Sequence, residues 1–263
     1  MEHAIAGRGG MSVIWKDGRF ADADSAQIFH TDGGFANGLA VFDSMLAQDN
    51  ILLDAREHFD RLIHDAGVVL GLSPSFLPAF EQLTEAWMPL LTRNKLTHGN
   101  ARIRTVVTGG ISDRPLGTGE IPTIVISAGA SGDAGNLPPL ICAVISAHPR
   151  IAGDRLENCK RADYTRSFAA RREAQRMGAD EAILTNTKGD IACGATSNLF
   201  IEEKGVLVTP PLTEGVLAGI TRAKIIKMRD VREEPISERR LRGADGVYLT
   251  NSFFGMRKAI LKV

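Results

Sequence analysis

The sequence predicts an α+β protein of two domains, and three observations support this prediction. The chain has 263 residues, which is long for one compact core and comfortable for two smaller ones. Segments that alternate like strands are interspersed with segments of helical periodicity. The stretch 129–135 (GASGDAG) has small residues without apolar periodicity, as linkers do. We therefore expect a domain boundary near residue 130, with a first domain over residues 1–130 and a second over residues 131–263.

Composition and charge favour a protein whose partners are small molecules or a second copy of the chain. Lys plus Arg and Asp plus Glu both number 31, so no net field attracts nucleic acid or an anionic membrane. No apolar run approaches the roughly 20 residues that span a bilayer, and the first ten residues lack the apolar core of a signal peptide. Cys142, Cys159 and Cys193 lack metal-ligand spacing. We expect a cytoplasmic protein with reduced thiols and no metal.

The expected first domain begins with a hairpin and continues with two helices. Residues 12–20 (SVIWKDGRF) contain Asp-Gly between β-formers, which is a strong hairpin signal. The segment 57–62 (EHFDRL) begins a helix with apolar residues at helical spacing. A second helix is expected from Pro78 to about Met88, because the following Pro89 disfavours its continuation.

A strand and a turn-rich segment complete this domain. Residues 100–108 (NARIRTVVT) alternate like a strand, which places Arg102 and Arg104 on one face. The segment 109–119 is rich in glycine and turn formers and contains Arg114. Without further information, these arginines are ordinary exposed charges.

The second domain combines a lysine, a hairpin and a helix start. Lys160 precedes an amphipathic helix, and the segment 178–200 (GADEAILTNTKGDIACGATSNLF) predicts the hairpin. A second helix begins at residues 219–222 (GITR), where the N–H groups of a first turn can hold a phosphate. A lysine and a phosphate cradle are what an enzyme built on pyridoxal 5'-phosphate requires.

This order of motifs resembles the class IV aminotransferases, the fold-type IV group of pyridoxal phosphate enzymes that includes branched-chain aminotransferases, D-amino acid aminotransferases and aminodeoxychorismate lyase. The likeness extends from about residue 12 to residue 263. It implies a small α/β domain, a larger pseudo-barrel domain, a cofactor in the cleft between them, and a homodimer. It also implies an aminotransferase that acts on a small amino acid or amine with a keto acid. Aminodeoxychorismate lyase, which releases pyruvate, and a weakly active or non-catalytic cofactor-binding protein are the alternatives.

The resemblance implies cofactor-binding roles for six residues. Lys160 would be the Schiff-base lysine, and Tyr164 would hydrogen-bond the phenolic oxygen of the cofactor. The backbone N–H groups of Ile220 and Thr221 would bind the phosphate, since a helix N-terminus carries unpaired donors and partial positive charge. Two further residues, Arg61 and Ser252, would add donors to the same phosphate.

The implied substrate-binding residues are two arginines of the first domain. Arg104 corresponds to a basic residue near the substrate carboxylate in related enzymes, and Arg114 is the weaker candidate. A guanidinium group offers a fork of donors that suits carboxylate and phosphate oxygens.

Position 193 departs from the family pattern. Relatives carry a glutamate five residues before the position of Asn198, and its carboxylate pairs with the pyridine nitrogen of the cofactor. Cys193 stands there instead. A thiol has an ordinary pKa near 8.5 and is mostly neutral at pH 7, so it cannot hold a protonated ring as a carboxylate does. We therefore expect the cofactor ring to withdraw electrons less strongly than in the relatives. Three explanations are compatible with this expectation: the reaction tolerates an unprotonated ring, Asp190 or a water contacts the ring nitrogen instead, or the protein has low activity.

Overall fold

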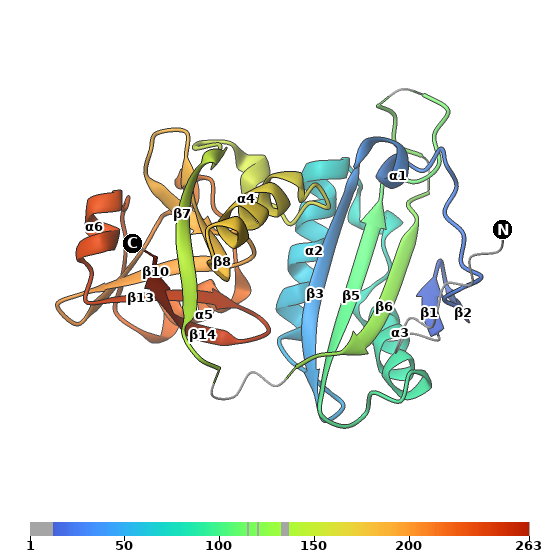
Figure 1. Cartoon of the computed structure of the whole chain (residues 1–263). Helices are drawn as coiled ribbons and strands as arrows, with labels where there is room; N and C mark the ends of the chain where they lie inside the picture. The colour runs from blue at the N-terminus through green and yellow to red at the C-terminus, as the bar shows by residue number, and fades with distance from the viewer. Residues whose placement is uncertain (1–12, 115, 120, 133–136, 263) are drawn as a thin grey trace. The chain divides into compact units, whose positions relative to one another are not determined.

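The computed structural model describes residues 13–114, 116–119, 121–132 and 137–262. Its internal contacts divide the chain into two compact units, Met1–Asp133 and Ala134–Val263, which Figure 1 shows in blue to green and in yellow to red. Each unit has its own sheet and its own core.

The first unit is a six-stranded antiparallel sheet with helices packed on one face (Figure 1). Its strand order is β2-β1-β6-β5-β3-β4, and the long pairing of β3 with β5 forms its centre. The strands are β1 (Val13–Lys16), β2 (Arg19–Asp22), β3 (Ala40–Gln48), β4 (Ile51–Leu52), β5 (Asn100–Thr108) and β6 (Ile124–Ala130). The helices are α1 (Gly33–Asn37), α2 (Ala55–Leu70), the 3-10 turn η1 (Pro74–Phe76) and α3 (Phe80–Arg93).

The core of the first unit lies between the sheet and the helices α2 and α3. Leu62 of α2 and Trp87 of α3 pack with Ile103 and Ile126 of the central strands, and all four side chains are buried. Burying an apolar side chain of this size contributes about 1.5–3 kcal/mol. The apolar periodicity of the two helices thus determines which faces they bury.

Two expected boundaries in this unit are wrong. Helix α3 continues through Pro89 to Arg93, although a proline inside a helix removes a backbone hydrogen bond. The next two residues, Leu90 and Leu91, are fully buried, and their burial offsets that loss. Strand β6 extends to Ala130 by pairing with β5, so the expected linker begins inside a strand. Residues 133–135 of that linker lie outside the described part of the chain.

The second unit is built on a closed barrel. Its sheet follows the order β12-β11-β10-β13-β14-β7-β8-β9, and an additional pairing of β9 with β10 closes a ring of six strands. This barrel confirms the pseudo-barrel that the family resemblance implies. The strands are β7 (Leu140–Arg150), β8 (Glu181–Asn186), β9 (Ile191–Gly194), β10 (Asn198–Glu203), β11 (Val206–Thr209), β12 (Val231–Glu233), β13 (Gly246–Asn251) and β14 (Gly255–Leu261). The helices are η2 (Arg155–Asn158), α4 (Thr165–Arg176), η3 (Leu212–Glu214), α5 (Ile220–Met228) and α6 (Glu238–Gly243).

The barrel wall separates two apolar clusters. Ile183 of β8 belongs to a cluster with Leu199 and Leu249, whereas its neighbour Leu184 belongs to a cluster with Ala170 of α4 and Cys193 of β9. This alternation follows from the two-residue period of a strand. Cys193 therefore lies on the side of the sheet that α4 covers.

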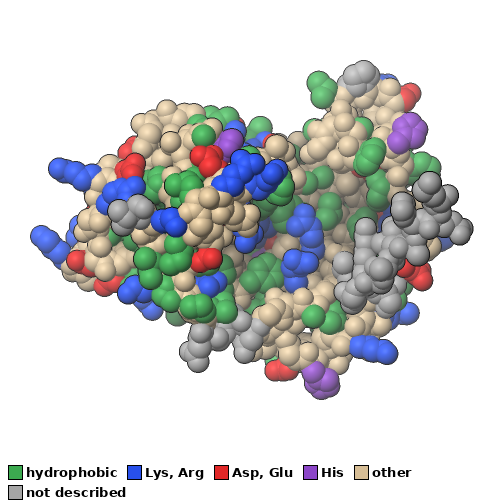
Figure 2. Space-filling model, viewed as in Figure 1, with side chains coloured by type: hydrophobic (Ala, Val, Ile, Leu, Met, Phe, Trp, Pro, Cys, Tyr) green, Lys and Arg blue, Asp and Glu red, His purple; other side chains and the backbone are tan. Residues whose placement is uncertain are grey.

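Charged side chains of both signs appear on the visible face of each unit (Figure 2), in agreement with a formal net charge of zero. Within the described residues, no single helix is long and apolar enough to cross a membrane. One bent helix pair, Ala55–Leu70 with Pro74–Arg93, passes the same test of length and composition when its members are taken together, and it turns by 110° at its break.

Candidate active site

Lys160 lies in a short loop between η2 and α4. Its side chain is half-buried, and its Nζ donates a hydrogen bond to the hydroxyl of Tyr164 at 3.2 Å. Helix α4 begins only at Thr165, with Tyr164 as its N-cap residue. The loop, not a helical turn, brings the amine and the phenol together.

Hydrogen bonds join the Lys160 loop to the start of α5. The backbone N–H of Ala218 donates to the carbonyl oxygen of Asn158 at 3.1 Å. The Asn158 side chain donates in turn to the carbonyl oxygen of Val216 at 2.7 Å. Because Asn158 is two residues before Lys160 and Ala218 is two residues before Ile220, the lysine and the helix start lie in adjacent, connected segments.

The first turn of α5 has backbone donors and a glycine N-cap. Gly219 is the N-cap residue, and no side chain caps the helix. Ile220 and Thr221 occupy the first two helical positions, where backbone N–H groups have no acceptor within the helix. A Cβ atom on Gly219 would come within 1.9 Å of the Asn198 Oδ1 atom, so only glycine fits between the helix and this side chain.

Asn198 connects the start of α5 to Cys193. Its side chain donates to the carbonyl oxygen of Leu217 at 2.9 Å, and its backbone pairs with Cys193 across the barrel closure. On its other side Asn198 pairs with Thr250 of β13. The residues around positions 160, 193, 217–221 and 250 thus form one neighbourhood within the second unit.

Two buried hydroxyl groups near this neighbourhood lack hydrogen-bond partners among the described residues: those of Ser197 and Thr250. Ser252 is half-buried in the turn after β13, where the Asn251 side chain accepts hydrogen bonds from the N–H groups of Phe253 and Phe254. The family resemblance assigns a phosphate-binding role to Ser252 of this segment. The hydroxyl of Thr250, which has no partner among the described residues, makes Thr250 a second candidate that no sequence pattern indicates.

Cys193 is buried, and burial raises the pKa of its thiol. Charged groups act on this pKa in both directions: Arg150 and Arg166 lower it, and Glu157 and Glu181 raise it. The thiol therefore stays neutral at physiological pH, as the sequence indicated.

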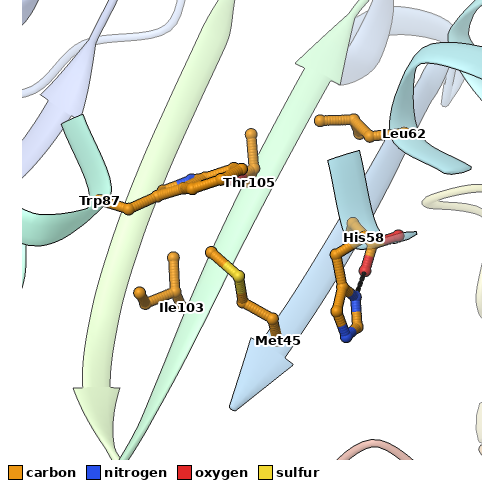
Figure 3. A pocket seen from close by; sticks show the side chains of 7 residues that line it. Met45, His58, Leu62, Trp87, Ile103 and Thr105 are labelled. Carbon is orange, nitrogen blue, oxygen red and sulfur yellow. Dashed lines mark hydrogen bonds and ion pairs between the residues drawn. The ribbon is translucent and has the colours of Figure 1, made fainter. Parts of the chain in front are cut away.

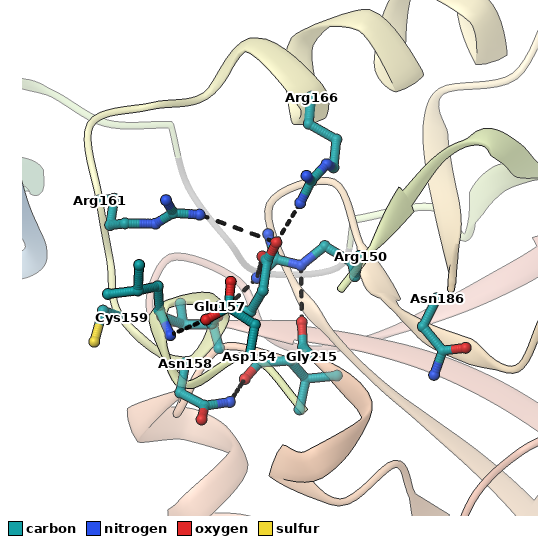
Figure 4. A network of polar contacts seen from close by, with 12 residues as sticks. Arg150, Asp154, Glu157, Asn158, Cys159, Arg161, Arg166, Asn186 and Gly215 are labelled. Atoms are coloured by element: carbon teal, nitrogen blue, oxygen red, sulfur yellow. Dashed lines mark hydrogen bonds and ion pairs between the residues drawn. The ribbon is translucent and has the colours of Figure 1, made fainter. Parts of the chain in front are cut away.

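A cluster of charged residues lies beside the Lys160 loop (Figure 4). Glu157 is fully buried and contacts Arg150 at 2.8 Å and Arg166 through an ion pair, with Arg161 at 4.0 Å. Arg150 also donates from Nε to the carbonyl oxygen of Gly215 at 2.8 Å. We call these four residues the Glu157 cluster. Sequence reasoning missed it because buried ion pairs have no local sequence signature.

In the first unit, Arg61 is held by a buried carboxylate. Its Nε and Nη2 atoms donate to Asp43 at 2.7 and 2.9 Å, and His58 Nδ1 lies 2.6 Å from the same carboxylate. Burial alone would raise the pKa of Asp43, but Arg61 and His58 hold it well below its usual range. Figure 3 shows His58 directed at this carboxylate beside a cavity of about 10 Å³ that Trp87 also lines.

The two expected substrate arginines occupy different settings in this unit. Arg104 is half-buried on β5, and its guanidinium carbon lies 3.6 Å from the centre of the Phe42 ring, a stacking arrangement that favours a cation. Arg114 is exposed in the loop that follows β5, where its N–H donates to the Ser112 hydroxyl at 3.2 Å. Neither belongs to the unit that contains Lys160.

The residues of the second unit fit pyridoxal 5'-phosphate on three counts. They provide an amine at Lys160, a helix N-terminus without a side-chain cap at α5, and a buried hydroxyl without a partner at Thr250. Backbone N–H groups and hydroxyls are suitable donors for a phosphate dianion. An amine is the group that binds the aldehyde of this cofactor.

Comparisons with known proteins agree with this reading. The family model described as amino-transferase class IV matches residues 40–260. A putative branched-chain-amino-acid aminotransferase of Methanocaldococcus jannaschii is 32% identical over 252 residues, which cover 91% of this chain and 84% of the relative.

Two solved structures show the same fold. The branched-chain aminotransferase of Thermoproteus uzoniensis, crystallised with norvaline, superposes with a TM-score of 0.87 at 26% identity, covering 96% of this chain and 88% of that one. A putative 4-amino-4-deoxychorismate lyase of Legionella pneumophila superposes with a TM-score of 0.82 at 26% identity, covering 90% and 87%. The family model matches most of this chain, and a relative at 32% identity covers 91% of it. This chain therefore belongs to the class IV aminotransferases, which are pyridoxal phosphate-dependent enzymes.

Proposed function

We propose that this protein transfers the amino group of a small apolar amino acid, of the branched-chain type, to a keto acid, and that Lys160 is its catalytic residue. The observation that carries the proposal is the hydrogen bond between Ala218 and Asn158, because it joins the lysine loop to the start of α5. The names of the relatives support the substrate class, since the Methanocaldococcus jannaschii relative and one at 31% identity in Escherichia coli are both called branched-chain-amino-acid aminotransferases.

Each residue of the site has a defined task in this proposal. Lys160 Nζ would bind the cofactor covalently and, when displaced by the substrate amine, would move a proton from the substrate Cα. Tyr164 would orient the lysine through the 3.2 Å hydrogen bond. Ile220, Thr221, Ser252 and Thr250 would bind the phosphate. When bound, pyridoxal phosphate supplies an aldehyde that reacts with amines and a ring that withdraws electrons.

The arginines of the first unit complete the proposal. Arg104 would bind the substrate carboxylate, since its guanidinium is already ordered by stacking on Phe42. Arg61 would contribute positive charge toward the phosphate while Asp43 fixes its orientation. Arg114, whose side chain is exposed, would be a second candidate for the substrate carboxylate.

A trapping experiment tests the role of the lysine. The protein is loaded with pyridoxal phosphate, reduced with borohydride and digested, and the modified peptide is identified by mass spectrometry. We expect the adduct at residue 160 and its loss in Lys160→Ala. Lys188→Ala is the matched control, because Lys188 lies in the same unit but is exposed and paired with Glu214 at 3.0 Å. An adduct that persists in Lys160→Ala would refute the assignment.

A lyase activity is the second candidate, because the Legionella pneumophila structure named as a putative 4-amino-4-deoxychorismate lyase matches this fold. The two functions differ in their need for an acceptor. An aminotransferase requires a keto acid, whereas the lyase would release pyruvate from aminodeoxychorismate without one. Pyruvate formation in the absence of any keto acid would favour the lyase, and keto acid-dependent consumption of branched-chain amino acids would favour the aminotransferase.

A further inference from the structure

A surface cavity of the second unit lies outside the site described above. It has a volume of about 580 Å³ and is lined mostly by residues of β10, β11, β13 and β14 and by the two residues that follow α5. Pockets that bind small molecules typically measure roughly 300–1,000 Å³. Helix α5 has nine residues, and its rise per residue separates its two ends by about 13 Å. The cavity at the end of α5 is therefore distinct from the proposed phosphate donors at its start.

Tyr248 and Glu202 form a fixed polar group in this cavity. Their chain neighbours Val247 and Ile201 belong to a buried apolar cluster, so Tyr248 and Glu202 lie on the other face of the sheet. The Tyr248 hydroxyl donates to Glu202 Oε2 at 2.9 Å. Gly246 pairs with Glu202, and a Cβ atom on Gly246 would lie 2.9 Å from both Cε2 and the hydroxyl oxygen of Tyr248. The missing side chain at position 246 thus leaves the space in which the tyrosine ring reaches the carboxylate.

Two apolar side chains form another part of the lining. Leu207 of β11 pairs directly with Glu202 and is buried, and Met256 of β14 is half-buried. Both side chains line the cavity. A thioether side chain adapts readily to the shape of an apolar group placed against it. The cavity therefore offers an apolar surface next to its polar group.

Four charged side chains line the same cavity, two of each sign. Arg229 and Lys258 are positive, and Glu202 and Asp230 are negative. Lys258 pairs with Tyr248 across β13 and β14, whereas Arg229 and Asp230 follow α5 directly. Among the residues that the structure describes, no ion pair joins any two of these four charges. Because the four charges sum to zero, the lining matches a ligand that carries one positive and one negative group rather than a polyanion.

We propose that this cavity binds a free amino acid with an apolar side chain, in its zwitterionic form. The carboxylate of the ligand contacts Arg229 and Lys258, its ammonium group contacts Glu202 and Asp230, and its side chain lies on the apolar surface. No bond is made or broken there. The inference goes beyond the proposed function, because it requires neither the lysine nor the cofactor. An amino acid of the same class as the proposed substrate thus has a second binding site on this chain.

Equilibrium dialysis with radiolabelled L-leucine tests the site. The protein is first loaded with pyridoxal phosphate and reduced with borohydride, so that leucine finds no free aldehyde to react with. We expect saturable binding of one leucine per chain. The double variant Arg229→Gln with Lys258→Gln should bind leucine about ten- to a hundredfold less tightly, because charged hydrogen bonds to the carboxylate are lost.

The matched control is the double variant Arg239→Gln with Lys227→Gln. It removes the same charge from two exposed side chains of the same unit that do not line the cavity, and it should bind leucine as the wild type does. No saturable binding by the wild type, or an undiminished affinity in the variant of Arg229 and Lys258, would overturn the proposal.

Competition with truncated ligands tests the zwitterion. The probe 4-methylpentanoate keeps the side chain and carboxylate of leucine but lacks the ammonium group, and 3-methylbutylamine lacks the carboxylate. Each should displace labelled leucine at least about tenfold less well than unlabelled leucine does. In Glu202→Gln, leucine should lose affinity whereas 4-methylpentanoate should not. Equal displacement by leucine and 4-methylpentanoate would reduce the cavity to a simple anion site and overturn the assignment.

The two proposals fail in different ways. Absence of a borohydride adduct at Lys160 would remove the proposed function and leave the cavity as a binding site. A normal adduct without saturable leucine binding would remove only the role of the cavity.

Discussion

The variant Asp43→Asn should destabilise the first unit by about 3–5 kcal/mol, which is the usual cost of removing one partner from a buried ion pair. Asp43 is 5% exposed. Its carboxylate lies 2.6 Å from His58 Nδ1 and accepts hydrogen bonds from Arg61 Nε and Nη2 at 2.7 and 2.9 Å. Asparagine keeps the shape of the side chain but loses its charge, so Arg61, with a side chain only 10% exposed, would lose the counter-charge of this carboxylate. Urea unfolding at constant m-value measures the loss.

The matched control is Asp60→Asn on the same helix. Asp60 pairs with Arg56 at 2.9 Å, but both side chains are more than half exposed, and such a pair contributes no more than about 0.5 kcal/mol. Because the folded-state pKa of Asp43 is lowered, its contribution is present above the unfolded value of about 3.9 and disappears as the pH falls through the folded value. The difference between wild type and variant should therefore shrink in acid. A loss no larger than that of the control would refute the reasoning.

Three further predictions concern the second unit. Gly219→Ala should lower the free energy of unfolding by about 1–3 kcal/mol and weaken cofactor binding, because the added Cβ would lie 1.9 Å from the Asn198 Oδ1 atom. In the control variant Gly243→Ala, the added Cβ has no heavy atom within 4 Å. Equal melting temperatures of the two variants would contradict this prediction. Burial raises the pKa of Cys193, so a disulfide reagent at pH 8 should label this thiol in urea but not in the folded protein. Tyr164→Phe should keep the borohydride adduct but lower the turnover about tenfold, because one hydrogen bond to the lysine is lost, and an unchanged turnover would argue against its orienting role.

Local patterns predicted much of the fold. The hairpin at residues 12–20 forms as β1 and β2, because Asp-Gly fixes its turn within four residues. Helix α5 begins at Ile220 as expected, since a glycine N-cap is a local signal. The predictions failed where packing opposed local preference, as at Pro89, where two buried leucines keep the helix intact.

The sequence by itself determined the family, the position of Lys160 and the start of helix α5 at Ile220, because these features are motifs of fixed spacing along the chain. Only the tertiary structure decided which charges surround them. The contact of Arg150 with Glu157, the pairing of Cys193 with Asn198 at the barrel closure, and the capture of Arg61 by Asp43 arise from strands and loops brought together by burial. Such contacts depend on the direction of each buried side chain, and that direction is set by packing across the whole unit.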